Sequence, residues 1–124
     1  ETETESNDLL LVEGVGGLMV PLTTSKTVLD WIKALKYPVI MVAGSYLGTI
    51  SHTLTTVETA QKFGLNVASI VISESEHSPV PIHETANSIR RFLSNIPVLE
   101  LPRLAPSSTP WQEAPELIIK NSVT

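Results

Sequence analysis

The sequence contains no cysteine, which excludes a disulfide scaffold, thiolate catalysis and any thiolate-bound metal within its 124 residues. Its eight Lys and Arg residues are scattered, so there is no basic stripe of the kind that binds nucleic acid. No apolar run approaches the roughly 18 residues that cross a bilayer, and no secretory signal is visible. We therefore expect a cytoplasmic protein that binds neither nucleic acid nor membrane.

Charged residues are also scarce, at 17% of the chain, against roughly 25% in average soluble domains. Because the predicted strands are strongly apolar as well, more of the surface should be covered than in a free-standing monomer. The covering is either a partner subunit or a missing piece of the same domain. The first residue is Glu1, so we expect an internal or processed start.

A phosphate-binding loop is absent too. The sequence has no GxxxxGK[ST] motif, and none of its lysines follows a glycine. By itself the chain is therefore not expected to hold a nucleoside triphosphate in the usual way.

Apolar and amphipathic segments alternate along the chain from Asp8 onward. Short apolar runs bounded by turn residues predict strands, and apolar positions three and four apart predict helices. Strands are predicted at residues 9–12, 39–43, 67–72 and 98–101. Helices are predicted at residues 27–36, after Gly44 as far as Gly64, and between Pro81 and Pro97, with a further short helix near residues 116–120.

This alternation predicts an α/β fold, a parallel sheet with flanking helices. Residues 1–7 are interpreted as a polar lead-in, and residues 8–124 as part of a single domain. Ligands of such sheets bind beyond the carboxyl ends of the strands. The loops to inspect are those at residues 13–17, 44–49, 73–79 and 102–104.

The first of these loops begins with Glu13, directly after the first predicted strand, and continues with Gly14, Gly16 and Gly17. Glycines let the backbone approach a ligand closely and present N–H groups to an anion. A carboxylate beside such a turn suits a magnesium–nucleotide complex, because magnesium prefers hard oxygen ligands and phosphates. The local pattern leaves an alternative equally open, a solvated glutamate before a flexible turn.

The second loop leads into a helix with the sequence LGTISH at residues 47–52. Free N–H groups and the helix dipole make such a start an anion site, to which Thr49 and Ser51 can add hydroxyl donors. An ordinary N-cap is the alternative interpretation.

Other conspicuous residues are given structural roles. The spacing of His52, His77 and His83 matches no metal motif, so they are interpreted as structural or solvated. Trp31 and Trp111 are interpreted as packing residues. Glu74 and Glu76 are taken as a solvated loop, unless Glu74 faces a nucleotide.

Two segments resemble signatures of the dethiobiotin synthetases. VEGVGG at residues 12–17, continuing to VPL at 20–22, resembles the VEGAGG…PL signature of that family. YPVIMV at 37–42 followed by LGTISHTL at 47–54 resembles the family's PVILV…LGTINHTLL segment in order and spacing. GLNV at 64–67 and the strand after it continue the match. The similarity spans about residues 8–104, which corresponds to the second half of a family member.

The resemblance implies a P-loop NTPase-like fold lacking its amino-terminal phosphate-loop half. The family joins 7,8-diaminononanoate, CO2 and ATP. One amine is carboxylated to a carbamate, ATP phosphorylates the carbamate, and the second amine closes the ureido ring and releases phosphate. Positioning and charge neutralisation do most of this work, so metal ligands and anion donors are the residues to expect.

Site residues are carried over by motif. Glu13 would ligate Mg2+, and Gly16 would lie against both the phosphates and the diamine. The complete nucleotide set implied by the resemblance is Glu13, Gly14, Val15, Gly16, Ser73, Glu74, Pro102, Arg103 and Leu104. The diamine's carboxylate would be held across a homodimer interface by Leu47, Gly48, Thr49, Ile50 and Ser51.

Some features depart from the family pattern. The family usually has Asn where Ser51 and Ser73 stand, and without an amide at position 73 the base selectivity is in doubt. Arg103 has no interpretable role. The catalytic lysine and a further metal-binding aspartate belong to the amino-terminal half, so no catalytic residue is assigned and the chain alone is expected to be inactive.

Two other hypotheses remain open. One is a different P-loop relative, such as a cobyrinate amidation enzyme or a partition-type ATPase. The other is a non-catalytic remnant that acts as a binding module.

Overall fold

The computed structural model describes residues 10–106 together with Thr109, Gln112 and Pro115. Strands and helices alternate through the described part of the chain, as the sequence predicts. In chain order the elements are α1 (Val28–Leu35), β1 (Val39–Gly44), α2 (Thr49–Lys62), β2 (Val67–Ser73), α3 (Ile82–Phe92) and β3 (Val98–Leu101). The helix expected near residues 116–120 lies outside the described residues.

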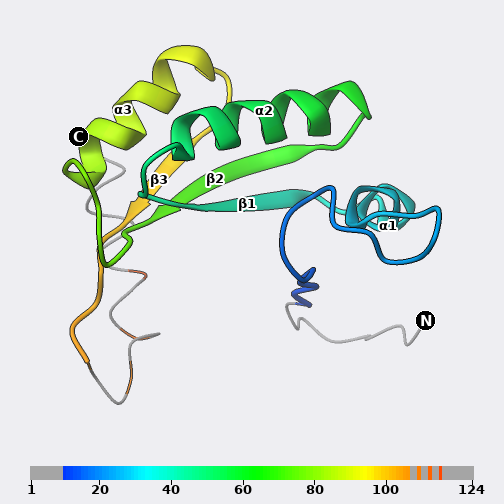
Figure 1. Ribbon diagram of the computed structural model, residues 1–124, viewed down its shortest axis with the longest axis horizontal. Coiled ribbons are helices and arrows are strands. Elements are labelled where there is room, and N and C mark those ends of the chain that lie inside the picture. The colour runs from blue at the N-terminus through cyan, green and yellow to red at the C-terminus, as the bar shows by residue number, and fades with distance from the viewer. Residues whose placement is uncertain (1–9, 107–108, 110–111, 113–114, 116–124) are drawn as a thin grey trace.

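The three strands form one parallel sheet in the order β1-β2-β3. Helices α2 and α3 lie together on one face of this sheet (Figure 1). All three strands run in the same direction, so their carboxyl ends meet at one edge, which we call the rim. The predicted parallel α/β fold with flanking helices is confirmed.

The core lies between this face of the sheet and the two helices. Ile70 and Ile72 of β2 are fully buried, because alternate residues of a strand point to the same face and this face is covered. Other members of the buried cluster are Val57, Ala86, Ile89, Ile96 and Val98. Within the described residues, no helix has the length and apolar character needed to cross a membrane.

One predicted strand is wrong. Residues 10–12 form no strand, and Leu10, Leu11 and Val12 are 68%, 74% and 46% exposed. A strand needs a neighbour to accept and donate its backbone hydrogen bonds, and the described residues supply none here. The apolar run therefore lies unpaired.

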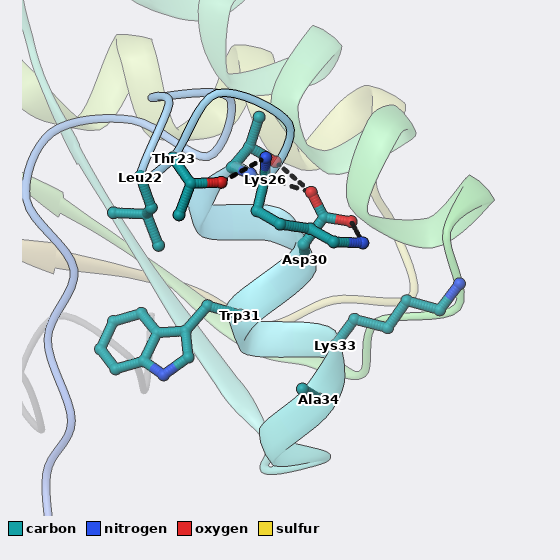
Figure 2. A pocket seen from close by; sticks show the side chains of 8 residues that line it. Leu22, Thr23, Lys26, Asp30, Trp31, Lys33 and Ala34 are labelled. Atoms are coloured by element: carbon teal, nitrogen blue, oxygen red, sulfur yellow. Dashed lines mark hydrogen bonds and ion pairs between the residues drawn. The ribbon is translucent and has the colours of Figure 1, made fainter.

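Helix α1 lies away from α2 and α3, at the end of the sheet where β1 begins (Figure 1). Its buried residues are Val28 and Leu29. A shallow depression of about 780 Å³ runs along it, with Leu22 and Trp31 on one side and Lys26 on the other (Figure 2).

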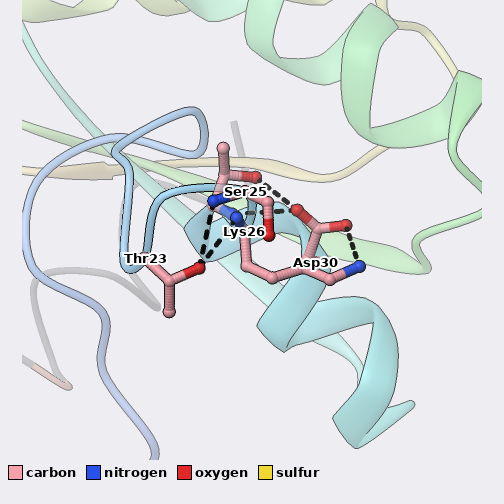
Figure 3. Close-up of polar contacts among 5 residues, drawn as sticks. Thr23, Ser25, Lys26 and Asp30 are labelled. Carbon is pink, nitrogen blue, oxygen red and sulfur yellow. Dashed lines mark hydrogen bonds and ion pairs between the residues drawn. The ribbon is translucent and has the colours of Figure 1, made fainter.

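The start of α1 is held by a compact polar network (Figure 3). Asp30 Oδ2 accepts hydrogen bonds from the backbone N–H of Thr27 at 2.9 Å and from its hydroxyl at 3.1 Å. Lys26 Nζ lies 3.8 Å from Asp30 Oδ1. Thr23 Oγ1 accepts from the N–H groups of Ser25 and Lys26. The hydrogen bond from the Thr27 backbone, aided by the Thr27 hydroxyl and by Lys26, lowers the pKa of Asp30 below its ordinary value.

When folding lowers the pKa of a carboxyl group, the charged group stabilises the fold at pH values above its pKa in the unfolded state. This stabilisation is lost as the pH falls through the lower pKa of the folded state. We therefore predict that Asp30→Asn is less stable than the parent at neutral pH. The difference should shrink as pH falls from about 4 downward. Thermal unfolding as a function of pH measures it. Glu58→Gln, on an exposed position of α2, is the control. An Asp30→Asn deficit that stayed constant down to pH 2 would contradict the capping role.

Candidate functional site

At the rim, the loops after β1 and β2 are tied together by a reciprocal pair of serines. The N–H of Ser45 donates to Ser75 Oγ at 3.0 Å, and the N–H of Ser75 donates to Ser45 Oγ at 2.9 Å. The Ser78 hydroxyl donates to the Ser45 carbonyl at 3.0 Å. Ser45 is fully buried. These hydrogen bonds therefore hold the two loops in a fixed position relative to each other, beyond the carboxyl ends of the strands.

Gly44 allows this close approach. A Cβ at position 44 would lie 2.8 Å from Ser75 Oγ, closer than a real side chain tolerates. The carbonyl of Gly44 also accepts the Thr49 hydroxyl at 2.6 Å, which fixes the first turn of α2 to the end of β1. Any larger residue at position 44 would push the serine pair apart.

The start of α2 presents free backbone donors at the rim. Gly48, the N-cap, has φ +94°, a conformation that glycine adopts without strain. The N–H of Thr49 donates to Tyr46 O, and that of His52 donates to Gly48 O. Within the described residues, the N–H groups of Ile50 and Ser51 have no acceptor. The hydroxyl of Thr49 is buried and used internally, so it is not among the donors left for a ligand, which include these two amides and the Ser51 side chain.

Tyr46 and His52 form a pair beside these donors. The Tyr46 hydroxyl lies 3.0 Å from His52 Nδ1, and the ring centroids are 5.8 Å apart. Both residues are exposed. The structural or solvated role expected for His52 agrees with this contact. Tyr46, Ser45 and Ser75 were not anticipated, although hydroxyl residues in the loops directly after buried strands were a signal in the sequence.

The loop after β3 is joined to the loop after β2 through Glu74. The Arg103 N–H donates to Glu74 Oε2 at 2.9 Å, and the Glu74 N–H donates to the Leu101 carbonyl at 2.9 Å. The Arg103 guanidinium lies 3.6 Å from Glu76 Oε2, in an exposed ion pair. Glu74 is half-buried and holds the backbone at Arg103, a positioning role that the sequence did not predict. Arg103, unexplained by sequence, ties residues 102–104 to the second loop.

Ser73 thus ends β2 at the rim, and Glu74, Pro102, Arg103 and Leu104 lie on the two adjoining loops that follow β2 and β3. Pro102 also borders a depression of about 1000 Å³ between α3 and β3. There the Arg90 guanidinium donates to Glu100 Oε1 at 2.8 Å.

The segment that begins at Glu13 lies elsewhere. Gly14 sits against α1, where a Cβ at position 14 would lie 3.1 Å from Val28 Cγ1. Figure 1 shows this blue segment near α1 and the beginning of β1, whereas α2 begins at the opposite end of the sheet. Glu13, Val15 and Gly16 are exposed, and within the described residues the Glu13 side chain makes no hydrogen bond or ion pair. The expected meeting of Glu13 with residues 47–51 is therefore not found. The unpaired run at residues 10–12 explains this, since no hydrogen-bond ladder aligns it with β1.

The depression along α1 (Figure 2) is also remote from the rim, and none of the site residues expected from sequence lines it. Among the described residues, no three His, Asp or Glu side chains converge as a metal cluster would require.

We predict that Ser45→Ala lowers the free energy of unfolding by about 1–3 kcal/mol, because the part-buried N–H of Ser75 loses its acceptor. Chemical denaturation measures this. Ser88→Ala is the matched control, since the Ser88 hydroxyl donates only within its own helix, to Glu84 O. Its effect should stay within about 0.5 kcal/mol. Equal losses in the two variants would show that the serine pair does not tie the loops together.

Comparison with known proteins shows what the chain is similar to. Residues 1–110 match the family described as AAA domain. The chain is 52% identical over 88 residues to an ATP-dependent dethiobiotin synthetase of Acidiphilium cryptum, an alignment covering 71% of this chain and 40% of the relative. It is 50% identical to the enzyme of that name from a Caulobacter species, covering 77% of this chain and 41% of the relative. It is 40% identical to the protein of the same name from Bacillus subtilis subsp. natto, in an alignment that covers 82% of this chain and 44% of the relative.

These matches confirm the resemblance to the dethiobiotin synthetases. In these alignments the chain spans about two fifths of the length of its curated relatives. On the match over residues 1–110 and the parallel α/β sheet, the chain belongs to the AAA domain family.

Proposed function

We propose that this chain is part of an ATP-dependent dethiobiotin synthetase, a ligase that converts 7,8-diaminononanoate, CO2 and ATP to a cyclic urea. The observation that supports it most is its identity of 40–52% to several proteins of that name over most of this chain. Because the chain spans only two fifths of those relatives, the activity belongs to the complete protein. A cytoplasmic location and a homodimer are part of the proposal.

In this proposal the start of α2 binds the carboxylate of the diamine. Ile50 and Ser51 offer two backbone donors at the positive end of a helix of 14 residues, where an anion is stabilised. Leu47 is 86% exposed, so this turn is accessible to a second subunit across an interface. Thr49 and Gly48 hold the turn in shape.

The nucleotide's adenine would lie against the two joined loops of the rim, which include Ser73, Pro102 and Leu104. Glu74 would act indirectly, by holding the backbone at Arg103 with its 2.9 Å hydrogen bond. A serine hydroxyl at position 73 carries one donor hydrogen on a short side chain, whereas the amide usual in the family presents two donor hydrogens and a separate carbonyl acceptor to a base edge. We therefore propose that base selectivity is lower here than in family members with Asn at this position.

The magnesium ion of such an enzyme would be bound in part by Glu13. Magnesium usually takes one or two carboxylates and completes its octahedron with substrate phosphates and water. An exposed, unpaired carboxylate fits that requirement, provided that the remaining oxygens come from elsewhere. When bound, the ion would neutralise charge on the phosphates. The backbone of Gly14, Val15 and Gly16 would lie against the same phosphates.

No catalytic residue is assigned within this chain. The phosphate loop, a lysine and a further acidic ligand would come from the remaining part of the polypeptide, so residues 1–124 alone should not turn over ATP. What the described residues contribute is positioning, because they hold the amide donors and the base-binding loops in fixed register at one edge of a sheet.

The proposed activity is tested on the product of the complete reading frame that contains this chain. ATP hydrolysis should require both the diamine and CO2, and its product should be the cyclic urea. ATP turnover that ignored the diamine would remove the substrate assignment. Calorimetric titration with ATP and magnesium that gave no heat of binding would instead identify a non-catalytic remnant.

For Glu13→Gln in the complete protein, we predict a loss of about 2–3 kcal/mol of transition-state stabilisation, or roughly 30- to 150-fold in kcat/KM. The loss should be partly offset by raising the magnesium concentration. Glu58→Gln, on the exposed side of α2, should leave the rate unchanged. If Glu13→Gln kept the parent's magnesium dependence, residue 13 would not be a metal ligand.

A further inference from the structure

A largely buried ion pair joins helix α3 to strand β3, which pack against each other (Figure 1). The Arg90 guanidinium donates to Glu100 Oε1 at 2.8 Å through Nη1 and to the Val98 carbonyl at 2.7 Å through Nη2. Nη1 also donates to Asn87 Oδ1, on the same helix, at 2.9 Å. Glu100 is buried, whereas the Arg90 side chain is 34% exposed. One arginine therefore holds two alternate residues of β3 at once.

The backbone of β3 explains why the Val98 carbonyl accepts a side-chain donor. The Ile70 N–H donates to Pro97 O at 2.9 Å, and Ile70 is in register with Val98. Backbone groups alternate along a strand, so those of Pro97 and Leu99 face β2 and those of Val98 face away from it. Within the described residues, β2 is the strand that pairs with β3, and no strand lies on its other side. Arg90 therefore gives the Val98 carbonyl a partner that no strand supplies there.

An ion pair at this place constrains geometry more than it adds stability. Burying a carboxylate has a desolvation cost, and well-packed apolar side chains can join a helix to a strand equally firmly. A guanidinium, however, has donors in fixed directions within one plane, so it binds two acceptors in a defined arrangement. Glu100 directly precedes Leu101, the last residue of β3. The pair therefore fixes the direction in which the chain leaves the sheet.

Leu101 connects this pair to the rim. Its carbonyl accepts the Glu74 N–H at 2.9 Å, and Glu74 Oε2 accepts the Arg103 N–H at 2.9 Å. These two hydrogen bonds shape the loop at residues 102–104, against which the adenine lies in the proposed function. A continuous series of contacts thus runs from Arg90 through Glu100 and the end of β3 to this loop.

We propose that the Arg90–Glu100 pair is a positioning element for the nucleotide. It sets the end of β3, and through it the loop at residues 102–104, so the affinity for ATP depends on it. The inference rests on the proposed function for the identity of the ligand. The proposed donors to the diamine lie elsewhere, at the start of α2, which the Thr49 hydroxyl fixes to β1 through the Gly44 carbonyl. Loss of the pair should therefore affect ATP and not the diamine.

Three variants of the complete protein test this role. Arg90→Met combined with Glu100→Leu removes both charges together, so no carboxylate is left buried without a partner. Arg90→Lys keeps the charge, but an ammonium group does not reproduce the planar donors that reach both Glu100 and Val98. Arg91→Met is the matched control, because Arg91 is exposed on the same helix and makes no hydrogen bond or ion pair within the described residues.

Steady-state kinetics compares the two substrates. We expect the double variant to raise KM for ATP about tenfold or more, with kcat and KM for the diamine within about twofold of the parent. Arg90→Lys should lie between the double variant and the parent, and Arg91→Met should match the parent. A double variant that kept the parent's KM for ATP, or whose two KM values rose equally, would overturn the proposal.

Amide hydrogen exchange without ATP or diamine tests the positioning directly. The Glu74 N–H donates to Leu101 O, whereas the adjacent Ser75 N–H donates to Ser45 Oγ and serves as the internal control. In the double variant we expect exchange at Glu74 to be about tenfold faster or more, and exchange at Ser75 to be unchanged. Equal acceleration at both amides, which indicates general destabilisation, would overturn the proposal, and so would no change at either.

The exchange experiment also separates this inference from the proposed function. A complete protein that did not use ATP, but whose double variant showed the selective change at Glu74, would contradict the proposed function and not the positioning of the loop. An active ligase without that change would contradict the positioning role alone.

Discussion

Parallel pairing of β1, β2 and β3 is the constraint on which the rest of the structure depends. It brings the carboxyl ends of all three strands to one rim, where polar groups of neighbouring loops form hydrogen bonds with one another. Ser45 and Ser75 tie the first two loops together, and Glu74 ties the second loop to Arg103. Bonds of this kind fix backbone donors before a ligand arrives, so less ordering is needed on binding.

The same constraint shows which edge and which face of the sheet are open among the described residues. Each interior strand of a parallel sheet needs two neighbours and two covered faces, and β1 has one neighbour and one covered face among the described residues. Charged residues are also few, at 17% of the sequence, and the apolar residues Ile40, Val42 and 10–12 are exposed.

The sequence predicted the elements that depend on local periodicity and failed where a distant neighbour decides the outcome. Helices α1, α2 and α3 and strands β1, β2 and β3 were predicted, because their apolar spacing and flanking prolines are local signals. Residues 10–12 have the same apolar character, yet pairing is not a local property. The LGTISH segment was enough to predict that α2 begins at the rim. The hydrogen bonds from the Thr49 hydroxyl to the Gly44 carbonyl and from the Arg103 N–H to the Glu74 carboxylate could not be predicted, because they depend on three-dimensional geometry that sequence spacing does not encode.

The central proposal is that residue 13 and the start of α2 contribute to one ligand site in the complete protein. A crystal structure of the complete protein with ATP and magnesium tests it most directly. The account predicts a Glu13 oxygen about 2.1 Å from the metal. A structure in which Glu13 stayed beside α1, with the metal bound elsewhere, would contradict it.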